Sequence, residues 1–385
     1  MKKLTALAAI AAAGIAALAT VQIAGAEGGH SHYGRHHGNA AGRSPHLDHV
    51  FVIMMENTAY SDLLDPSNSN TSFIRSLAST YGLETDYYGV THTSLPNYVA
   101  VTSGSTWGSN ADDEAQADQG YFDHLNLVDQ LEQAHVSWKG YMESMPSAGY
   151  TGNYGDCSST DPDCTSSPTG NALYVRKHNP FFQYPDVFDN AHRTGDVVPL
   201  TQLTTDLNTG RVPQFVWITP NICNDMHGGA PQCPYPNTPT DQYQAALYQD
   251  GDTFLRTWVT AIMHSRAWTG HSAIFITWDE GGYEDSSPYA PEDDTGCCDS
   301  PVLPSSPANP ATGGGGDLAG GTEYGGGHVP MIVVTRDGPH GVTDSTPTNH
   351  YSLLQTIEQN WRLPYLGDAG DTVQVHSLAP LLSGH

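Results

Sequence analysis

The sequence predicts an α/β fold with a mostly parallel central sheet flanked by helices. Four continuous apolar segments have the length and composition of buried strands. They are residues 49–55, 214–219, 272–278 and 329–335. Helix-like patterns lie between and after them, at residues 71–82, 121–138, 251–268 and 350–361. Because strands that alternate with helices form helix-covered parallel sheets, these two observations define the fold class.

Each strand assignment rests on an unbroken apolar run. The runs read HVFVIMM, QFVWIT, SAIFITW and VPMIVVT, and they are rich in the β-branched and aromatic residues of buried strands. In the last helix, Leu353, Leu354, Ile357 and Trp361 repeat at helical spacing. The chain contains no internal sequence repeat.

Residues 1–26 have the pattern of a secretory signal peptide. Lys2 and Lys3 precede an apolar stretch that extends to about Ile23, and small residues ending at Ala26 suit cleavage. No later stretch approaches the roughly 20 apolar residues that a membrane-spanning helix needs. We therefore expect a secreted, extracellular protein that has no stable membrane anchor.

Composition divides the remaining chain into a leader and a domain. Residues 27–46 hold five histidines among Gly, Ser and Ala, so we expect a flexible His-rich leader. Residues 47–385 are expected to form a single domain. Within this domain, the Gly- and Pro-rich stretch 285–327 is an insertion, either a mobile flap or a disulfide-tied loop.

The chain is strongly acidic, with 14 Lys and Arg against 41 Asp and Glu and a formal net charge of −27. Such a chain is a poor general binder of nucleic acids or anionic membranes, so we expect no nucleic-acid binding. Beyond the signal peptide the only lysines are Lys139 and Lys177. The densest cationic cluster is Arg176-Lys177-His178. It forms either a salt-bridged loop or a local positive potential for a phosphate group.

Six cysteines in an exported chain favour disulfides over metal binding, and no spacing matches a zinc ribbon or finger. Local bridges are the first expectation for the two pairs that are close in sequence, Cys157–Cys164 and Cys223–Cys233. The pairing of the adjacent Cys297 and Cys298 stays open.

Polar side chains follow three of the predicted strands. Glu56-Asn57 ends the first, Asn221 and then residues 224–227 follow the second, and Asp279-Glu280 ends the third. In a doubly wound sheet, ligands bind beyond the carboxyl ends of the strands, although a single acidic strand end is usually a cap or a solvated turn. Carboxylate and carboxamide oxygens suit Mg²⁺, Ca²⁺ or Mn²⁺ better than Zn²⁺.

The stretch HTSLPNY at residues 92–98 predicts the start of a helix. Pro96 fits the first turn, where its missing N–H costs nothing, so Ser94 lies at or just before the helix start. An ordinary N-cap explains such a serine. The free backbone donors and the dipole would also stabilise an alkoxide or a phosphate at that position.

Six sequence blocks occur in one order along the chain. They are MMEN (54–57), THTSLPNY (91–98), YVRKHNPF (174–181), PNICNDMH (220–227), TWDEGG (277–282) and NHYSLLQTIEQNWRLP (349–364). Together they resemble the phosphoesterase family of bacterial acid phosphatases and phospholipases C, a branch of the alkaline phosphatase superfamily. The chain looks most similar to the short secreted acid phosphatases of that family, over about residues 48–366.

The resemblance implies a role for each matching residue. Ser94 corresponds to the family's nucleophile, and His178 and His227 correspond to histidines that face the phosphate, one of which protonates the leaving group. One divalent metal ion is implied, with the ligands Glu56, Asn57, Ser94, Asp279 and Glu280. Three further positions match residues at the substrate, namely Lys177, Asn97 and His350. His350 could instead anchor the last helix.

The resemblance therefore implies a secreted, metal-dependent phosphoesterase that hydrolyses phosphate monoesters through a phosphoserine on Ser94. A close alternative is a phospholipase C-like phosphodiesterase acting on phospholipid headgroups, although no clear lipid-facing hydrophobic loop or basic interfacial patch supports it. A classical serine hydrolase would need a G-x-S-x-G elbow, which the chain lacks. The acidic composition and the His-rich leader also suggest a non-catalytic, metal-binding secreted protein.

Overall fold

The computed structural model describes residues 46–109, 112, 122–157, 172–230, 233, 240–268, 270–282, 293, 295–300 and 325–383. The expected signal peptide, almost all of the expected leader and most of the insertion at 285–327 lie outside these residues. Cys164 also lies outside them, so its expected bridge to Cys157 stays a prediction.

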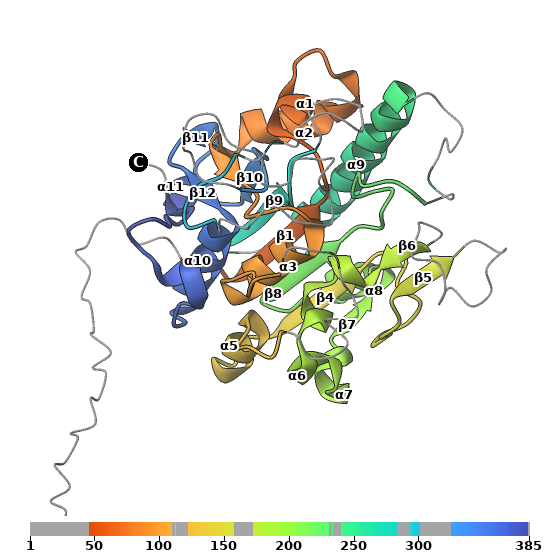
Figure 1. The fold of residues 1–385 in the computed structure, drawn as a ribbon, viewed down its shortest axis with the longest axis vertical. Coiled ribbons are helices and arrows are strands. Elements are labelled where there is room, and N and C mark those ends of the chain that lie inside the picture. The colour runs from red at the N-terminus through yellow and green to blue at the C-terminus, as the bar shows by residue number, and fades with distance from the viewer. Residues whose placement is uncertain are drawn as a thin grey trace, which may run out of the picture. The chain divides into compact units, whose positions relative to one another are not determined.

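The described chain is built around one eight-stranded sheet with the strand order β11-β2-β10-β9-β1-β8-β4-β7 (Figure 1). Its strands, in chain order, are β1 (His49–Met55), β2 (Gly82–Glu84), β4 (Trp138–Met142), β7 (Val197–Pro199), β8 (Phe215–Thr219), β9 (Ser272–Trp278), β10 (Met331–Thr335) and β11 (Val342–Asp344). Two small two-stranded sheets pair β3 (Tyr87–Tyr88) with β12 (Thr348–Asn349), and β5 (Tyr154–Cys157) with β6 (Ala172–Val175).

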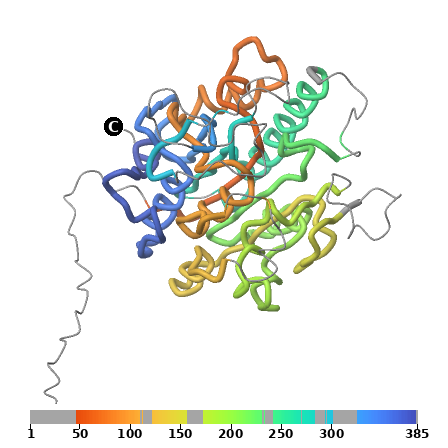
Figure 2. Tube along the Cα trace, viewed as in Figure 1, coloured from red at the N-terminus to blue at the C-terminus, as the bar shows by residue number. Residues whose placement is uncertain are grey.

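The sheet is mostly parallel. β1 pairs in parallel with β8 and β9, and β4 pairs in parallel with β7 and β8. β10 is antiparallel to both of its neighbours, β9 and β2. The colours of Figure 2 show that strands far apart in sequence lie side by side, since β1 lies between β9 and β8. The carboxyl ends of β1, β8 and β9 therefore meet at one edge of the sheet.

Helices cover this sheet. The α-helices are α1 (Tyr60–Leu64), α2 (Ser72–Thr80), α3 (Ser94–Ser103), α5 (Leu127–Gln133), α6 (Pro185–Phe188), α7 (Ala191–Thr194), α8 (Thr201–Thr209), α9 (Thr240–Met263), α10 (His350–Trp361) and α11 (Ala379–Ser383). Short 3₁₀ turns occur at Ser69–Thr71, Arg176–His178, Pro180–Gln183 and Gly367–Gly370. α2 packs against α9 and α3 packs against α10, while Figure 1 shows α9 and α10 on opposite sides of the central strands.

The central strands form the core. Every residue of β8, β9 and β10 is buried, as is every residue of β1 after His49. Strands with both faces covered lose the usual alternation of apolar and polar residues, which explains their continuous apolar sequences. The predicted α/β class and the four predicted strands are confirmed, with shifts of at most two residues at their starts.

One predicted helix is confirmed only in part. Within the expected range 121–138 the helix is α5, Leu127–Gln133, and the last residue of the range, Trp138, begins β4. β4 contains Lys139 and Gly140, so its apolar pattern is interrupted. The glycine is required by packing, because a Cβ atom there would lie 2.7 Å from Cε2 of Phe181.

Two disulfides are present among the described residues. Cys223 is bonded to Cys233, as the local spacing predicted, and Cys297 is bonded to its neighbour Cys298. Within the described ranges, no helix combines the length and the apolar character that crossing a membrane would require.

Candidate active site

The polar residues that follow β1 and β9 lie side by side. The backbone N–H of Asp279 donates to the carbonyl oxygen of Met55 at 3.0 Å, and the N–H of Asn57 donates to Oδ1 of Asp279 at 3.1 Å. Glu56 and Asp279 are fully buried, and Glu280 is only 5% exposed. The parallel pairing of β1 with β9 thus brings the predicted carboxylates together at one edge of the sheet.

Ser94 is the first residue of α3, and its side chain points at these carboxylates. Its Oγ donates to Oε2 of Glu56 at 3.0 Å or to Oε1 of Glu280 at 3.2 Å. The residue is buried, with 2% exposure, and Pro96 lies in the first turn of the helix as predicted. The N-cap residue Thr93 makes no side-chain cap. Ser94 therefore combines a helix N-terminus with acceptors for its hydroxyl proton.

The oxygen atoms around Ser94 have the arrangement of a cation site. The side-chain oxygen of Asn57 faces Oε2 of Glu56 at 2.8 Å and Oε1 of Glu280 at 3.3 Å, and only rotation of the amide would make these contacts hydrogen bonds. Oδ2 of Asp279 is buried without a hydrogen-bond partner among the described residues. Several side-chain oxygens thus converge around Ser94, whose single hydroxyl proton can serve only one of them at a time, and hard oxygen ligands of this kind fit a divalent cation.

Two histidines join the same cluster. Ligand atoms of Glu56, His178 and His227 all lie within 4.8 Å of one another. Nε2 of His178 lies 3.2 Å from Oε1 of Glu56 but is not in hydrogen-bond geometry, while its Nδ1 lies 3.2 Å from Oδ2 of Asp225. The predicted metal ligands were all oxygens. The two imidazoles add a donor type that zinc and other transition metals also accept.

Burial shifts the pKa values of this cluster. Burial and the nearby Asp279 and Asp225 raise the pKa of Glu56 well above its ordinary value. Burial and Glu280 raise the pKa of Asp279 to about 8. Burial is the larger cause of both shifts and repulsion between the neighbouring carboxylates adds to it, so a divalent cation among them would lower both pKa values again.

The histidine pKa values shift in the opposite direction. Burial and the Lys177 ammonium lower the pKa of His227 to about 4. The same two causes, with His227, lower the pKa of His178 well below its ordinary value. Neutral imidazoles are the form that binds a metal, whereas an acid role needs a proton that a bound anion would help to retain.

Lys177 lies in a short 3₁₀ turn after β6, and its ammonium pairs with Oδ2 of Asp112 at 2.5 Å. Burial lowers the pKa of Lys177, but Asp112, Glu56 and Glu280 outweigh it and raise the pKa overall. The predicted cationic cluster therefore does lie within electrostatic reach of the buried carboxylates. Only Lys177 of that cluster has the charge and the position to attract an anion toward them.

The other two residues expected at the substrate are Asn97 and His350. In both, every polar side-chain atom has a partner within the protein. Oδ1 of Asn97 accepts from the N–H groups of Val90 and Thr91, and its Nδ2 donates to the carbonyls of Thr91 and Thr93. Asn97 thus holds the segment that leads to Ser94. Its contacts favour a positioning role over direct binding of substrate.

His350 is held in the same way. Its Nδ1 lies 2.9 Å from the hydroxyl of Tyr87, and its Nε2 lies 2.5 Å from the carbonyl oxygen of Asp279. The ring is fully buried. These contacts favour the alternative in which His350 anchors α10 to the strand end that carries Asp279.

Three residues of the cluster were missed by sequence reasoning. The Tyr98 hydroxyl donates to Oε1 of Glu56 at 2.6 Å, Nδ1 of His92 contacts Glu280, and the buried Asp225 lies against His178. Tyr98 could have been found, because position i+4 from Ser94 lies on the same helix face. Asp225 lies within residues 224–227, which were expected to follow a strand end, but no role was assigned to it.

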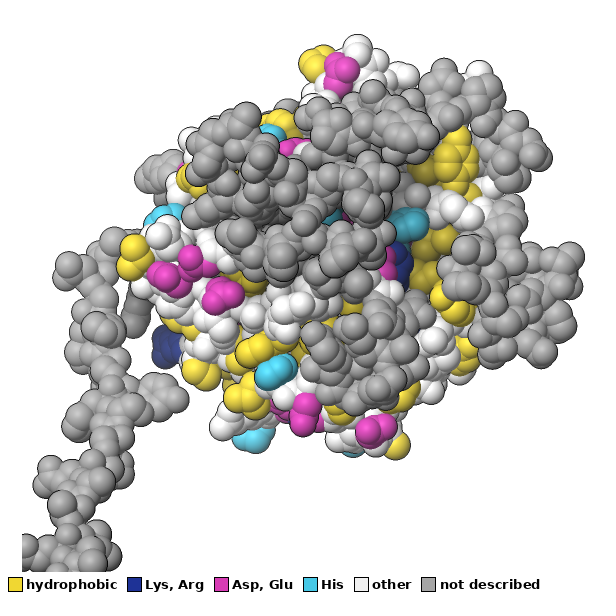
Figure 3. Space-filling view, in the orientation of Figure 1, with side chains coloured by type: hydrophobic (Ala, Val, Ile, Leu, Met, Phe, Trp, Pro, Cys, Tyr) yellow, Lys and Arg dark blue, Asp and Glu magenta, His cyan; other side chains and the backbone are white. Residues whose placement is uncertain are grey.

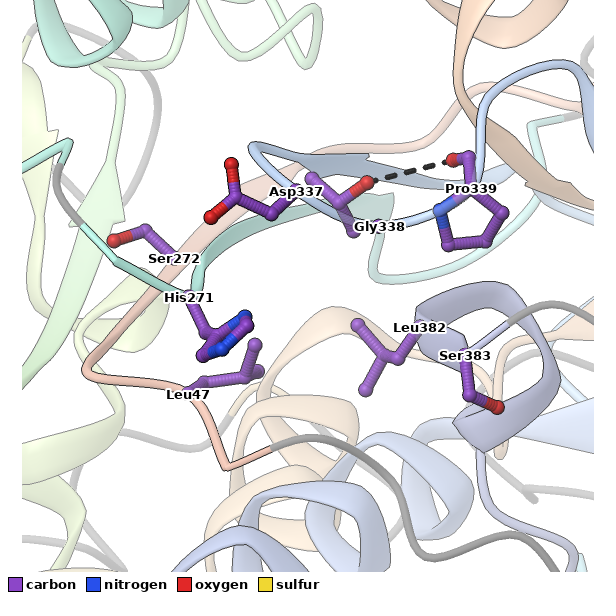
Figure 4. Close-up of a pocket in the computed structure, with 9 residues that line it drawn as sticks. Leu47, His271, Ser272, Asp337, Gly338, Pro339, Leu382 and Ser383 are labelled. Atoms are coloured by element: carbon purple, nitrogen blue, oxygen red, sulfur yellow. Dashed lines mark hydrogen bonds between the residues drawn. The ribbon is translucent and has the colours of Figure 1, made fainter.

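A separate surface cavity lies at the opposite edge of the sheet (Figure 4). Ser272, the first residue of β9, and Thr335, the last residue of antiparallel β10, line it together with His271 and Asp337. The predicted catalytic residues are therefore at the other end of these strands. Figure 3 shows acidic side chains spread over the described surface in this view, with few basic ones.

The fold and the site define a class: an α/β protein with a buried serine beside a cluster of carboxylates and imidazoles, a candidate cation site, at the carboxyl edge of a mostly parallel sheet. The chain belongs to the Phosphoesterase family, whose model matches residues 65–364. The resemblance stated above is thereby confirmed at the level of the family.

Individual relatives are more distant. The chain is 28% identical over 323 residues to an acid phosphatase of Aspergillus fumigatus, covering 83% of this chain and 56% of that protein. It is 26% identical over 332 residues to a phosphatidylinositol-3-phosphatase of Mycobacterium tuberculosis, covering 86% and 83%. This chain thus spans little more than half the length of the fungal relative.

A solved structure from a study of glycosaminoglycan metabolism by Bacteroides thetaiotaomicron has a similar fold, with a TM-score of 0.51. It is 12% identical and covers 88% of this chain and 82% of its own. At that identity the likeness shows the fold alone.

Proposed function

We propose that this protein is a secreted, metal-dependent phosphoesterase that hydrolyses phosphate monoesters through a phosphoserine on Ser94. One observation carries the proposal: Ser94 Oγ lies at a helix N-terminus, within 3.2 Å of carboxylates delivered by two neighbouring strands. An ordinary N-cap serine would accept a bond from the backbone of its own helix, whereas Ser94 donates outward. The family membership and the phosphatase names of two relatives support the same reaction class.

The oxygen cluster supports one bound divalent ion. Glu56, Asn57, Asp279 and Glu280, with Ser94 itself, would hold it, and the imidazoles of His178 and His227 lie close enough to contribute. When bound, such an ion lowers the pKa of a serine hydroxyl and neutralises charge on a phosphoryl group. The predominance of oxygen donors favours Mg²⁺, Ca²⁺ or Mn²⁺.

The protein residues would then act in two steps. In the first, the Ser94 hydroxyl would give its proton to the carboxylate to which it donates, Glu56 or Glu280, while a bond forms between Oγ and phosphorus and the bond to the ester oxygen breaks. In the second, water attacks the phosphoserine, the Oγ–P bond breaks and inorganic phosphate leaves. The first-turn N–H groups of α3 and the Lys177 ammonium would stabilise the phosphoryl oxygens.

A histidine would protonate the departing alkoxide. His227 is the less buried of the two candidates, and its Nδ1 lies 2.9 Å from the Gly228 carbonyl, which fixes a proton on that nitrogen. Nε2 is then the atom that can carry the transferred proton. Both nitrogens of His178 lie against carboxylates, so His178 suits a supporting role.

The proposal is tested with p-nitrophenyl phosphate and its bis-ester, in the presence of divalent metal and after chelation. We expect monoester turnover that is abolished by the chelator and by Ser94→Ala. Ser103→Ala, in the last turn of the same helix, is the matched control and should retain turnover. Turnover of the bis-ester alone would favour the phospholipase C-like alternative, and turnover by Ser94→Ala would remove Ser94 from the mechanism.

Export, a single domain over residues 47–385 and the absence of nucleic-acid partners are part of the same proposal. The Cys223–Cys233 and Cys297–Cys298 bonds support an oxidising compartment. Expression in a secreting host should give a protein in the medium whose N-terminus lies near Glu27. Retention of residues 1–26 on the exported protein would contradict the predicted cleavage.

A further inference from the structure

The Asp112 carboxylate accepts hydrogen bonds from three donors around Ser94. Its Oδ1 accepts from the backbone N–H of Leu95 at 2.9 Å and from the hydroxyl of Thr93 at 2.8 Å. Its Oδ2 accepts from the ammonium of Lys177 at 2.5 Å. Two of these three donors belong to the residues on either side of Ser94, so one carboxylate occupies the helix N-terminus at which the nucleophile lies.

These donors form the kind of set that binds phosphate. A first-turn backbone N–H, a hydroxyl and an ammonium recur at phosphate-binding helix N-termini, where the dipole also favours negative charge. Thr93 is the N-cap residue, yet its hydroxyl donates to Asp112 and does not cap α3. The donors are therefore available to an anion from outside the helix, and in this structure that anion is Asp112.

The surroundings explain why an anion must be there. The Lys177 side chain is only 16% exposed, and a buried ammonium without a partner is strongly unfavourable. Of the described acids, Glu56 and Glu280 also act on the Lys177 charge, but they face Ser94 and the Asn57 amide. Asp112 is 28% exposed, so its carboxylate can exchange these contacts for water more readily than a fully buried acid could.

We propose that Asp112 is a built-in competitor of the substrate's phosphoryl group. It holds the donors of Thr93, Leu95 and Lys177 in the resting protein and exchanges them with phosphoryl oxygens when substrate or product binds. This inference rests on the proposed function only in placing the phosphoryl group at Ser94. The rival explanation is that Asp112 stays in place and positions Lys177.

The two explanations predict opposite effects on phosphate affinity. When the protein's own carboxylate occupies the donors most of the time, the apparent affinity for phosphate is reduced. It equals the intrinsic affinity multiplied by the fraction of molecules in which the donors are free. Removal of the competitor should therefore tighten binding of inorganic phosphate, by about tenfold for one charge-assisted contact. Removal of a positioning residue should weaken it.

The experiment is calorimetric titration of inorganic phosphate into the full mature chain in buffer containing Mg²⁺, and again in Mn²⁺. The variants are Asp112→Asn, which keeps the shape and frees Lys177, and Asp112→Ala, which frees all three donors. Asp206→Asn is the matched control, because Asp206 also pairs with a lysine. Its partner is Lys139, at a distance of 2.9 Å, and this pair lies away from the site. We expect about tenfold tighter binding for both Asp112 variants and no change for the control.

Unchanged or weaker phosphate binding by the folded Asp112→Asn protein would overturn the inference. Thermal unfolding of each variant identifies a failure to fold, and the isosteric Asp112→Asn decides the question if Asp112→Ala does not fold. Parallel assays with p-nitrophenyl phosphate separate the two proposals. A wild type that hydrolyses it while Asp112→Asn leaves phosphate affinity unchanged would contradict only the competitor. Tighter phosphate binding without hydrolysis by the wild type would contradict only the proposed function.

Discussion

Two helices that pack against each other, α3 and α10, begin in opposite ways. α10 begins with a complete capping box: Oδ1 of Asn349 accepts from the N–H of Tyr351, and Oγ of Ser352 accepts from the N–H of Asn349. α3 begins at Ser94 without a side-chain cap from Thr93. The start of α10 thus satisfies its donors with its own side chains, whereas the start of α3 leaves donors for an anion.

The largest effect is expected at the α3 end. Ser94→Ala should lower turnover of phosphate monoesters by at least about 10³-fold, because the nucleophile is lost. The free energy of unfolding should change by only about 1 kcal/mol, since one hydroxyl is removed. Steady-state kinetics and thermal unfolding check the two halves. A variant that loses stability in proportion to activity would make Ser94 a structural residue like those of α10.

The next effect distinguishes His227, the proposed acid, from His350, which anchors α10. His227→Asn should slow hydrolysis of an alkyl phosphate by about 10²-fold or more, and that of p-nitrophenyl phosphate much less, because a good leaving group needs no proton. His350→Asn should reduce both rates equally and lower the melting temperature, since both ring nitrogens hold α10 in place. Equal losses on both substrates for His227→Asn would remove it as the acid.

A smaller effect is expected at the α10 cap. Asn349→Ala should lower the free energy of unfolding by about 1–2 kcal/mol, the usual range for loss of an N-cap. Nδ2 of Asn349 also donates to the carbonyls of Cys297 and Cys298, so the loss should lie at the upper end. Activity per folded molecule should be retained. A loss of activity without a loss of stability would show that the α10 end also serves catalysis.

The smallest effect concerns a buried acid of α10. Burial raises the pKa of Glu358 to about 8 from its ordinary 4.5, while its Oε1 accepts from the N–H of Leu366. The folded state therefore binds more protons than the unfolded state between these values. Its contribution to stability is complete below pH 4.5 and is lost as the pH rises toward 8.

Glu358→Gln should remove that loss. Relative to wild type, the variant should gain about 1 kcal/mol more at pH 6 than at pH 5. Denaturant unfolding at the two pH values measures the difference. Equal shifts at both pH values would mean that Glu358 is ionised in the folded protein.

The sequence predicted the central strands because their physical signal is local. β1, β8 and β9 are continuous apolar runs that end in polar residues, and this pattern alone locates the edge of the sheet with Glu56 and Asp279. The direction of β10 could not be predicted, because an apolar run is the same in either direction. β2, β7 and β11 are three residues each, too short to give a pattern.

The predicted site residues also divide into those with a local sequence signal and those without one. Ser94 and the strand-end carboxylates follow from local sequence and sheet topology. The pairing of Asp112 with Lys177 joins residues 65 positions apart, and the acids around His178 come from other segments of the chain. Such contacts exist only after folding, so neither the Asp112 contacts nor the anchoring of His350 could be deduced from spacing.

The proposed function requires that Ser94 becomes phosphorylated during turnover. The most direct measurement is rapid acid quenching of the metal-loaded protein with p-nitrophenyl phosphate, followed by peptide mass spectrometry. We expect a phosphoryl group on the peptide that carries Ser94, formed at the rate of turnover and absent from Ser94→Ala. Turnover by the wild type with no phosphorylated Ser94 at any quench time, together with activity in Ser94→Ala, would contradict it.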